Sequence, residues 1–143
     1  MKMFCLFAAA ALLLAGCAPV SRPAAGEETH EKPSYEILVL IETNELFLFC
    51  DEELFKTYPV AVGRVRHPTP RGEFTVTSMI ERPYTEAYGT RWIGLSAPNI
   101  GIHGTDDPSS IGKEASGGCV RMKNADIEEL FTYVSLGMKV FIL

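Results

Sequence analysis

One histidine, one cysteine and one arginine stand in a glycine-rich stretch of this sequence, at His103, Cys119 and Arg121. A free thiol is mostly protonated at neutral pH because its pKa is about 8.5, and a neighbouring imidazole can stabilise the reactive thiolate. An arginine two residues further along an extended chain leaves on the same face as the thiol, where its guanidinium can bind a carboxylate through two hydrogen bonds. These residue types together predict a cysteine nucleophile, its base, and a cation for an anionic substrate.

The segments around these residues suggest how the chain positions them. Residues 100–102 are typical of a short apolar strand that would carry the histidine at its end, and residues 105–110 are rich in turn formers and predict a loop. Gly117 and Gly118 allow the backbone to bend sharply before Cys119. We therefore expect the amide groups of Gly118 and Cys119 to face an oxyanion that develops on the substrate, with the backbone of Gly104 as the third candidate.

The order of these motifs resembles that of the L,D-transpeptidase catalytic domain family (YkuD-like), whose signature is a His-Gly pair followed by Ser-x-Gly-Cys-x-Arg or a close variant. Here the first motif is His103-Gly104 and the second covers residues 116–121. Many members have a second histidine where this chain has Gly117. The resemblance extends over residues 35–143, through matching segments at 46–49, 58–63, 69–74, 122–126 and 137–140.

The resemblance implies a role for each residue of the two motifs. Cys119 would be the nucleophile, and His103 would be the base that later protonates the leaving amine. A backbone carbonyl, that of Gly104 or one at residues 116–117, would orient the imidazole. The residues that the resemblance places in the substrate-binding part of the site are Arg121, Ser116 and Gly117.

The resemblance also implies a reaction on peptidoglycan stem peptides, without a cofactor or a metal. The thiol would attack the carbonyl between the third-position diamino acid and a terminal D-alanine, which gives an acyl-enzyme thioester. An amine acceptor would then take the acyl group, and the acceptor would be a neighbouring stem peptide, a lysine of a lipoprotein or a free D-amino acid. The result would be cross-linking or remodelling of the cell wall.

Two other functions fit the same residues. An L,D-carboxypeptidase, or another cysteine hydrolase of peptidoglycan, would transfer the acyl group to water. A non-catalytic wall-binding lipoprotein would keep the fold without the reaction. Nucleic acid is not expected as a partner, because the formal net charge is −5 and the chain has no basic run.

The first residues are typical of a bacterial lipoprotein signal peptide, which we place at residues 1–16. Lys2 precedes an apolar run too short to span a bilayer, and two small residues come directly before Cys17. The resemblance to a lipobox implies that Cys17 carries lipid and anchors the protein to a membrane of the cell envelope, facing the periplasm or extracytoplasmic space. Residues 17–34 contain proline, glycine, alanine and charge without an apolar period, so they predict a flexible tether. The catalytic domain would then be residues 35–143.

The predicted domain is mainly β, a β-sandwich of mixed sheets with one main helix near residues 125–135. In the helix, Ile127, Leu130 and Val134 follow the spacing of one buried face, with Asn124 as the N-cap and Gly137 as a left-handed C-cap. Alternating and continuous apolar runs predict strands at residues 35–41, 45–50, 54–62, 73–80, 91–95, 100–102 and 138–143.

Four further residues are interpreted from their surroundings. Cys50 is expected to be buried in its strand and not bonded to Cys119, because a disulfide would inactivate the nucleophile. Tyr84, Tyr88 and Trp92 either wall the substrate groove or pack in the fold, and the sequence favours neither reading.

Overall fold

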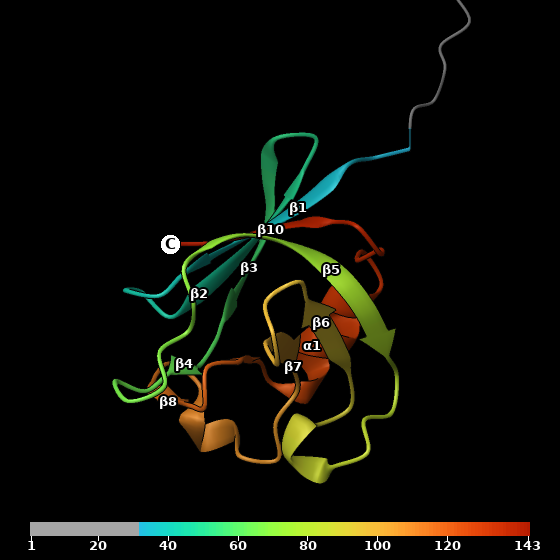
Figure 1. The fold of residues 1–143 in the computed structure, drawn as a ribbon. Helices are drawn as coiled ribbons and strands as arrows, with labels where there is room; N and C mark the ends of the chain where they lie inside the picture. The colour runs from blue at the N-terminus through green and yellow to red at the C-terminus, as the bar shows by residue number, and fades with distance from the viewer. Residues whose placement is uncertain (1–31) are drawn as a thin grey trace, which may run out of the picture. The chain divides into compact units, whose positions relative to one another are not determined.

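The structure, a computed structural model, describes residues 32–143, and within them the chain forms ten β-strands and one α-helix (Figure 1). The strands are β1 Tyr35–Leu40, β2 Glu45–Cys50, β3 Glu53–Pro59, β4 Val62–Gly63, β5 Gly72–Ile80, β6 Trp92–Leu95, β7 Gly101–His103, β8 Glu114–Ser116, β9 Val120–Arg121 and β10 Lys139–Ile142. The helix is α1 Asn124–Phe131, and short 3-10 turns cover Glu86–Tyr88 and Pro108–Ser110. The predicted signal peptide, residues 1–16, and the predicted lipidation site Cys17 lie outside the described residues, as does most of the predicted tether 17–34.

One predicted strand, residues 54–62, is divided in the structure. β3 ends at Pro59 and β4 begins at Val62, because the chain changes partner between them. The amide of Val60 donates to the carbonyl of Asn44, whereas Ala61 exchanges both backbone hydrogen bonds with Arg121. The apolar run continues through this change because residues 60–62 are fully buried.

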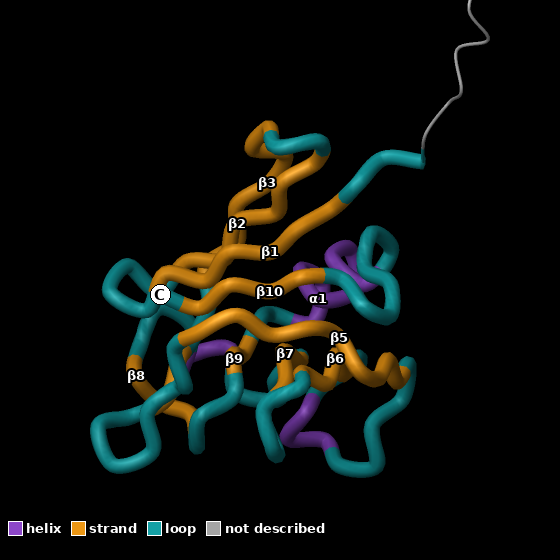
Figure 2. The backbone as a smooth tube through the Cα atoms, turned by 45° about the horizontal axis from the view of Figure 1, so that its top comes forward, coloured by secondary structure: helices purple, strands orange, loops and turns teal. Residues whose placement is uncertain are grey.

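The main sheet has eight strands in the order β3-β2-β1-β10-β5-β6-β7-β9, and β4 pairs with β8 separately (Figure 2). β1 with β10 and β7 with β9 are parallel, and the other pairs of the main sheet are antiparallel. β5 pairs with β10 near its start and with β6 near its end, and its register shifts between Val76 and Ser78. Such irregularities bend a strand, so β5 turns the corner between two layers. The predicted mainly β fold with mixed sheets is confirmed, and one curled sheet supplies both layers.

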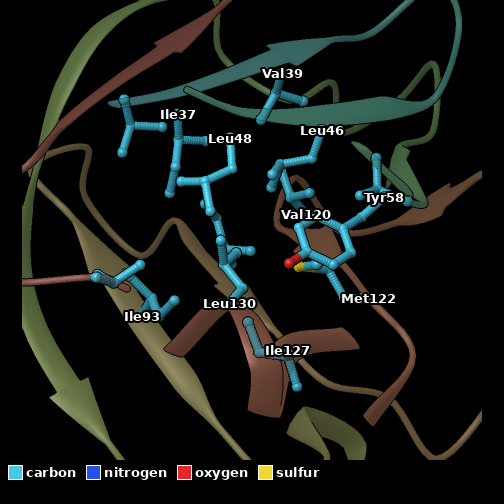
Figure 3. Packing of buried hydrophobic residues seen from close by; sticks show 14 of the residues in the cluster. Ile37, Val39, Leu46, Leu48, Tyr58, Ile93, Val120, Met122, Ile127 and Leu130 are labelled. Carbon is cyan, nitrogen blue, oxygen red and sulfur yellow. The ribbon is translucent and has the colours of Figure 1, made fainter. Parts of the chain in front are cut away.

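The hydrophobic core lies between the two layers and the helix, as Figure 3 shows. In β1 and β2 every second residue is buried, which is the two-residue period of a strand with one face on the core. The outer-facing residues of β2 are only half-buried. The fully buried side chains of the core include Ile37, Val39, Leu46 and Leu48 from one layer, Ile93, Ile102 and Val120 from the other, and Ile127 and Leu130 from α1.

The helix is shorter than predicted, because α1 ends at Phe131 and not near residue 135. Beyond it, Tyr133 donates to the carbonyl of Leu130 and Met138 to that of Ser135, so the chain continues in turns. These turns keep Val134 on the core, 8% exposed, which is why the apolar spacing outlasts the helix. Gly137 has the expected positive φ of 82°, but it lies in the later turn rather than at the helix C-cap. No helix within residues 32–143 has the length and the apolar sequence that crossing a membrane requires.

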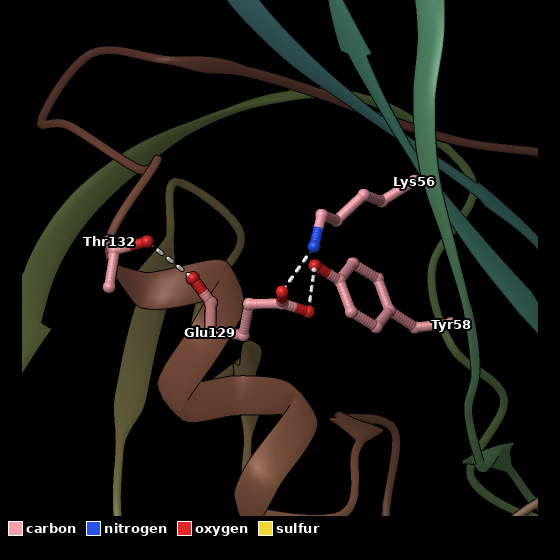
Figure 4. A network of polar contacts seen from close by, with 4 residues as sticks. All are labelled: Lys56, Tyr58, Glu129 and Thr132. Carbon is pink, nitrogen blue, oxygen red and sulfur yellow. Dashed lines mark hydrogen bonds and ion pairs between the residues drawn. The ribbon is translucent and has the colours of Figure 1, made fainter.

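A polar cluster connects the helix to the outer strand β3 (Figure 4). Glu129 forms an ion pair with Lys56 and accepts a hydrogen bond of 3.0 Å from the hydroxyl of Tyr58. The Lys56 hydrogen bond, followed by that of Tyr58, lowers the pKa of the Glu129 carboxyl. Both charged side chains are partly exposed, so solvent screens the pair and we expect it to contribute little to the stability of the fold.

Candidate active site

Parallel pairing of β7 with β9 brings the two sequence motifs together. Ile102 lies opposite Val120, and His103 lies opposite Arg121. The first pair is fully buried in the core, and successive side chains of a strand alternate between its faces. His103 and Arg121 therefore leave on the opposite face of the strands, and Cys119 directly precedes β9.

The imidazole of His103 is enclosed by two aromatic side chains and is only 2% exposed. It stacks on the indole of Trp92, with ring centroids 5.4 Å apart and 16° between the planes, and the ring of Tyr88 meets it edge-on at 4.8 Å. Its Nδ1 lies 2.5 Å from the carbonyl oxygen of Gly104. Because a carbonyl only accepts, Nδ1 must carry the hydrogen, and Nε2 keeps the lone pair that a base needs.

The surroundings favour the neutral forms of both reacting groups. Burial lowers the pKa of His103 to about 4, and the charge of Arg121 contributes, while the hydrogen bond to Gly104 opposes the shift. Burial raises the pKa of the Cys119 thiol, against a backbone hydrogen bond at Gly101 and the charge of Arg121. At neutral pH the resting site therefore holds a thiol and a neutral imidazole, not the thiolate ion pair that the residue types alone suggested.

The thiol of Cys119 is half-buried and has a backbone partner in this structure. Its Sγ donates to the carbonyl oxygen of Asn99 at 3.6 Å, and no hydrogen bond between Cys119 and His103 is found within residues 32–143. Hydrogen bonds of catalytic groups are often long or misaligned in a free enzyme and shorten when substrate binds. The fold thus brings the segment that carries Cys119 next to the strand that ends at His103, and no hydrogen bond joins the two side chains in this structure.

Ser116 fixes the turn that carries Cys119. Its hydroxyl donates to the carbonyl of Cys119 at 2.5 Å and accepts from the amide of Gly118 at 3.1 Å, and the residue is 1% exposed. Gly118 has a φ of 121°, and a Cβ there would lie 3.1 Å from the side chain of Ile100. Ser116 thus holds the turn through both of these hydrogen bonds, and its contact with substrate stays a prediction.

Two of the three amide groups expected at the oxyanion already have partners. Gly118 donates to Ser116, and Gly104 donates to the carbonyl of Arg91 at 3.1 Å. The amide of Cys119 is the remaining candidate of the three. Gly117, which was expected to contact substrate, is exposed, and no atom lies within 4 Å of the place where its Cβ would be.

Arg121 is half-buried, and its backbone is held by β7 on one side and by Ala61 on the other. Its charge acts to lower the pKa of His103, Cys119 and Asp107, although burial outweighs this effect at Cys119. The Nε atom of its guanidinium is buried and has no hydrogen-bond partner within residues 32–143. A buried N–H group without a partner is uncommon in folded proteins, and a carboxylate is the ligand that fits a guanidinium best.

A cavity of about 250 Å³ lies next to the aromatic side chains that pack on His103, although neither His103 nor Cys119 lines it. It reaches Asn99, whose carbonyl is the partner of the thiol. Trp92 and Tyr88 pack on His103 and also line this cavity, and their contact with substrate stays a prediction. Tyr84 is 90% exposed at its rim. The lining residues are Ile80, Pro83, Tyr84, Tyr88, Trp92 and Asn99.

The structure gives no metal site in the part of the chain that it describes. Residues 32–143 contain no group of three or more His, Cys, Asp and Glu side chains arranged to hold an ion. Cys50 and Cys119 are both free. Cys50 is half-buried rather than buried, and its thiol lies 3.9 Å from the carboxylate of Asp51 at the end of β2, in the other layer of the sheet.

The sequence analysis missed the contacts of one residue near the site. Asn124 was expected to cap α1, but Lys123 holds the N-cap position, and the side chain of Asn124 bonds elsewhere. Its Oδ1 accepts from the amides of Thr90 and Thr105, both at 3.2 Å. Because these partners are distant in sequence, no local pattern predicts the contact.

Comparison with known proteins is consistent with this geometry. Residues 34–142 match the model of the L,D-transpeptidase catalytic domain family. Over 108 residues the chain is 44% identical to the putative L,D-transpeptidase YkuD of Bacillus licheniformis and 43% identical to that of Bacillus subtilis. The aligned part covers 76% of this chain and 65% of each relative, so the chain spans less than two thirds of their length.

Solved structures share the fold at low sequence identity. An L,D-transpeptidase from Mycobacterium smegmatis superposes with a TM-score of 0.71 at 17% identity, over 78% of this chain and 59% of that one. The catalytic domain of an Enterococcus faecium L,D-transpeptidase gives 0.68 at 22% identity, over 77% of this chain and 97% of that one. With the family match across nearly all the described residues, this chain belongs to the L,D-transpeptidase catalytic domain family.

Proposed function

We propose that residues 35–143 catalyse an L,D-transpeptidase reaction on peptidoglycan stem peptides, with Cys119 as the nucleophile and His103 as the general acid and base. The observation that supports this most is the pairing of β7 with β9, because His103 lies opposite Arg121 and Cys119 directly precedes β9. A cavity lined by Tyr88 and Trp92, which pack on His103, and by Asn99, whose carbonyl accepts from the Cys119 thiol, offers a surface for part of the substrate. Family membership favours the same reaction.

The first half-reaction would acylate the enzyme. The Cys119 thiol leaves the carbonyl of Asn99 and gives its proton to Nε2 of His103 while Sγ attacks the carbonyl carbon before the terminal D-alanine. The Sγ–C bond forms, the C–N bond breaks, and Nε2 returns the proton to the amine of the departing D-alanine. The amide of Cys119 would donate to the oxyanion as it develops.

The second half-reaction would release the acyl group. The amine of an acceptor attacks the thioester carbon, its proton passes through Nε2 of His103, and the thiol is restored as the new amide forms. A stem peptide, a lipoprotein lysine or a free D-amino acid has the required amine. Water in place of the amine would make the protein an L,D-carboxypeptidase.

Arg121 would bind a carboxylate of the substrate near the nucleophile. The buried Nε without a partner supports this role, because a carboxylate oxygen would satisfy it. The nearby Asp107 does not form an ion pair with it within residues 32–143. Lysine at this position would keep the charge but lose the two-pronged geometry.

The test is product analysis by mass spectrometry with a defined tetrapeptide, with and without an amine acceptor. Release of D-alanine together with a cross-linked product is expected for transfer, and release with a tripeptide alone indicates hydrolysis. Cys119→Ala should abolish both, and a carbapenem should leave a covalent adduct on the wild-type thiol only. No release and no adduct in the wild-type protein would leave the non-catalytic wall-binding function.

We also propose that residues 1–16 are a lipoprotein signal peptide, that Cys17 is lipidated, and that residues 17–34 tether the domain to a membrane of the cell envelope. The apolar run and the small residues before Cys17 support this. Mass spectrometry of the N-terminal peptide from the membrane fraction should find a lipidated Cys17. Cys17→Ser should release the protein from that fraction, and an unmodified N-terminus in the wild-type protein would refute the proposal.

A further inference from the structure

Asn124 is placed where it can control the orientation of the imidazole. It is the first residue of α1, and its Oδ1 accepts two backbone hydrogen bonds, from Thr90 and from Thr105, each at 3.2 Å. Neither donor belongs to the helix. The side chain therefore joins the segment before β6 to the loop after β7.

Two glycines pack directly against this amide. A Cβ atom on either Gly89 or Gly104 would collide with Oδ1 of Asn124. A Cβ atom added at Gly104 would also lie 3.0 Å from the amide nitrogen of Thr90. The two segments thus approach each other closely around one oxygen atom, and only glycine at both positions leaves room for it.

Both segments hold His103. Gly104 supplies the carbonyl that bonds Nδ1, and its amide donates to the carbonyl of Arg91 at 3.1 Å. Gly89 follows Tyr88, whose ring lies edge-on against the imidazole at 4.8 Å. The Oδ1 of Asn124 accepts a hydrogen bond from the residue that follows each glycine. It therefore holds the carbonyl of Gly104 on one side of the imidazole and the ring of Tyr88 on another.

We propose that Asn124 is a positioning residue for the active site: through its two amide hydrogen bonds it holds Gly104 and Tyr88 so that His103 keeps a single tautomer, with Nε2 free as the base. The proposal rests on the proposed function for its catalytic consequence. The structural consequence, one fixed tautomer, holds whether or not the protein turns over a substrate.

The experiment compares Asn124→Asp with Asn124→Leu. Aspartate has the same shape and keeps an oxygen acceptor, and its charge at the first residue of a helix is favourable. Leucine has a similar size and accepts no hydrogen bond. Glu129→Gln is the matched control, because it weakens the contact of the same helix with β3 and touches neither loop.

Two readouts are taken on each full-length variant. The first is the nitrogen NMR signature of the His103 ring, which reports the tautomer without any turnover. The second is the rate of acylation by a carbapenem, separated into a binding and a chemical step. Asn124→Leu should give a mixture of tautomers and a chemical step slower by about 10- to 100-fold, with binding changed by less than about threefold. Asn124→Asp and Glu129→Gln should keep one tautomer and a rate within about threefold of wild type.

The outcomes separate the possibilities. A single tautomer and an unchanged acylation rate in Asn124→Leu would overturn the proposal. It would also be overturned if Asn124→Asp slowed acylation as much as Asn124→Leu does, because the oxygen acceptor would then be irrelevant. Should Asn124→Leu fail to fold, Asn124→Ala is measured against the same two criteria, and Asn124→Asp must still match wild type. A wild-type protein that shows one tautomer but no acylation would refute the proposed function and leave the positioning role standing.

Discussion

The indole of Trp92 lies almost parallel to the imidazole of His103, with 5.4 Å between the ring centroids and 16° between the planes. The two residues are direct partners in the antiparallel pairing of β6 with β7. Gly101 makes this possible, because a Cβ there would collide with the indole of Trp92. The stack shields the imidazole from water, and burial is the main reason that the pKa of His103 is lowered to about 4.

The first prediction is that Trp92→Leu returns the pKa of His103 from about 4 toward the ordinary value of about 6.5. Leucine cannot cover the ring, so water reaches the imidazole and solvates its charged form. We expect the free energy of unfolding to fall by roughly 2 kcal/mol with the lost packing. Proton NMR titration of the His103 ring and thermal denaturation measure the two effects.

Tyr84→Ala is the control for this substitution, because Tyr84 lines the same cavity but is 90% exposed. It should leave the pKa of His103 unchanged and alter the free energy of unfolding by less than about 0.5 kcal/mol. An unaltered titration in Trp92→Leu would contradict the shielding role of the stack.

The second prediction concerns the stability of the protein in mild acid. The pKa of His103 is about 4 in the folded chain, below its ordinary value of 6.5, so between these two values the unfolded chain binds a proton that the folded chain excludes. Stability from this group is therefore fully present above about pH 6.5 and is lost as the pH falls through about 4. The loss amounts to roughly 3 kcal/mol, since each pKa unit corresponds to about 1.4 kcal/mol.

Urea denaturation of wild type and His103→Gln between pH 7 and pH 4 tests this. Glutamine does not titrate, so the difference between the two proteins isolates His103 from the carboxylates that also titrate in this range. The free energy of unfolding of wild type minus that of His103→Gln should fall by roughly 3 kcal/mol as the pH falls. A constant difference would mean that the imidazole becomes charged inside the fold at no cost.

The third prediction is that removal of the charge at Arg121 makes the thiol harder to ionise. The guanidinium favours the thiolate of Cys119, so Arg121→Gln should raise the pKa of that thiol further and also raise the pKa of His103. The rate of alkylation by iodoacetamide should fall at pH 8 and recover only at higher pH. Arg121→Lys should keep most of the wild-type profile, because it keeps the charge.

Arg66→Gln supplies the control for net charge, since it removes one positive charge from an exposed loop position. Its alkylation profile should match that of wild type. Identical shifts in Arg66→Gln and Arg121→Gln would show that net charge, and not the position of the guanidinium beside the thiol, governs its ionisation.

The fourth prediction compares two neighbouring glycines of the nucleophile turn. Gly118 has a φ of 121° and faces the side chain of Ile100, so Gly118→Ala should lower the free energy of unfolding by about 1–3 kcal/mol. Gly117 has open space around it, so Gly117→Ala should change stability by less than about 0.5 kcal/mol. Chemical denaturation of both variants measures this, and equal losses would contradict the strained geometry assigned to Gly118.

Much of the fold follows from the sequence because strands carry a local signal. The apolar runs of β1 and β2 predict those strands to within one residue, and Ile127 and Leu130 identify the buried face of α1. The predictions were wrong where a local pattern has two structural explanations. Val134 keeps helical spacing although the helix has ended, and residues 60–62 stay apolar although the chain has left its strand partner.

The sequence by itself determined the residue types of the candidate site: a thiol, an imidazole and a guanidinium in a glycine-rich setting, at His103, Cys119 and Arg121. Only the tertiary structure decided their protonation and their partners. The pKa of an imidazole depends on its burial, and at His103 that burial comes from Trp92 and Tyr88, while Asn124 contacts the adjoining loop. These groups come from other segments of the chain, and residue spacing carries no information about contacts that long-range strand pairing creates.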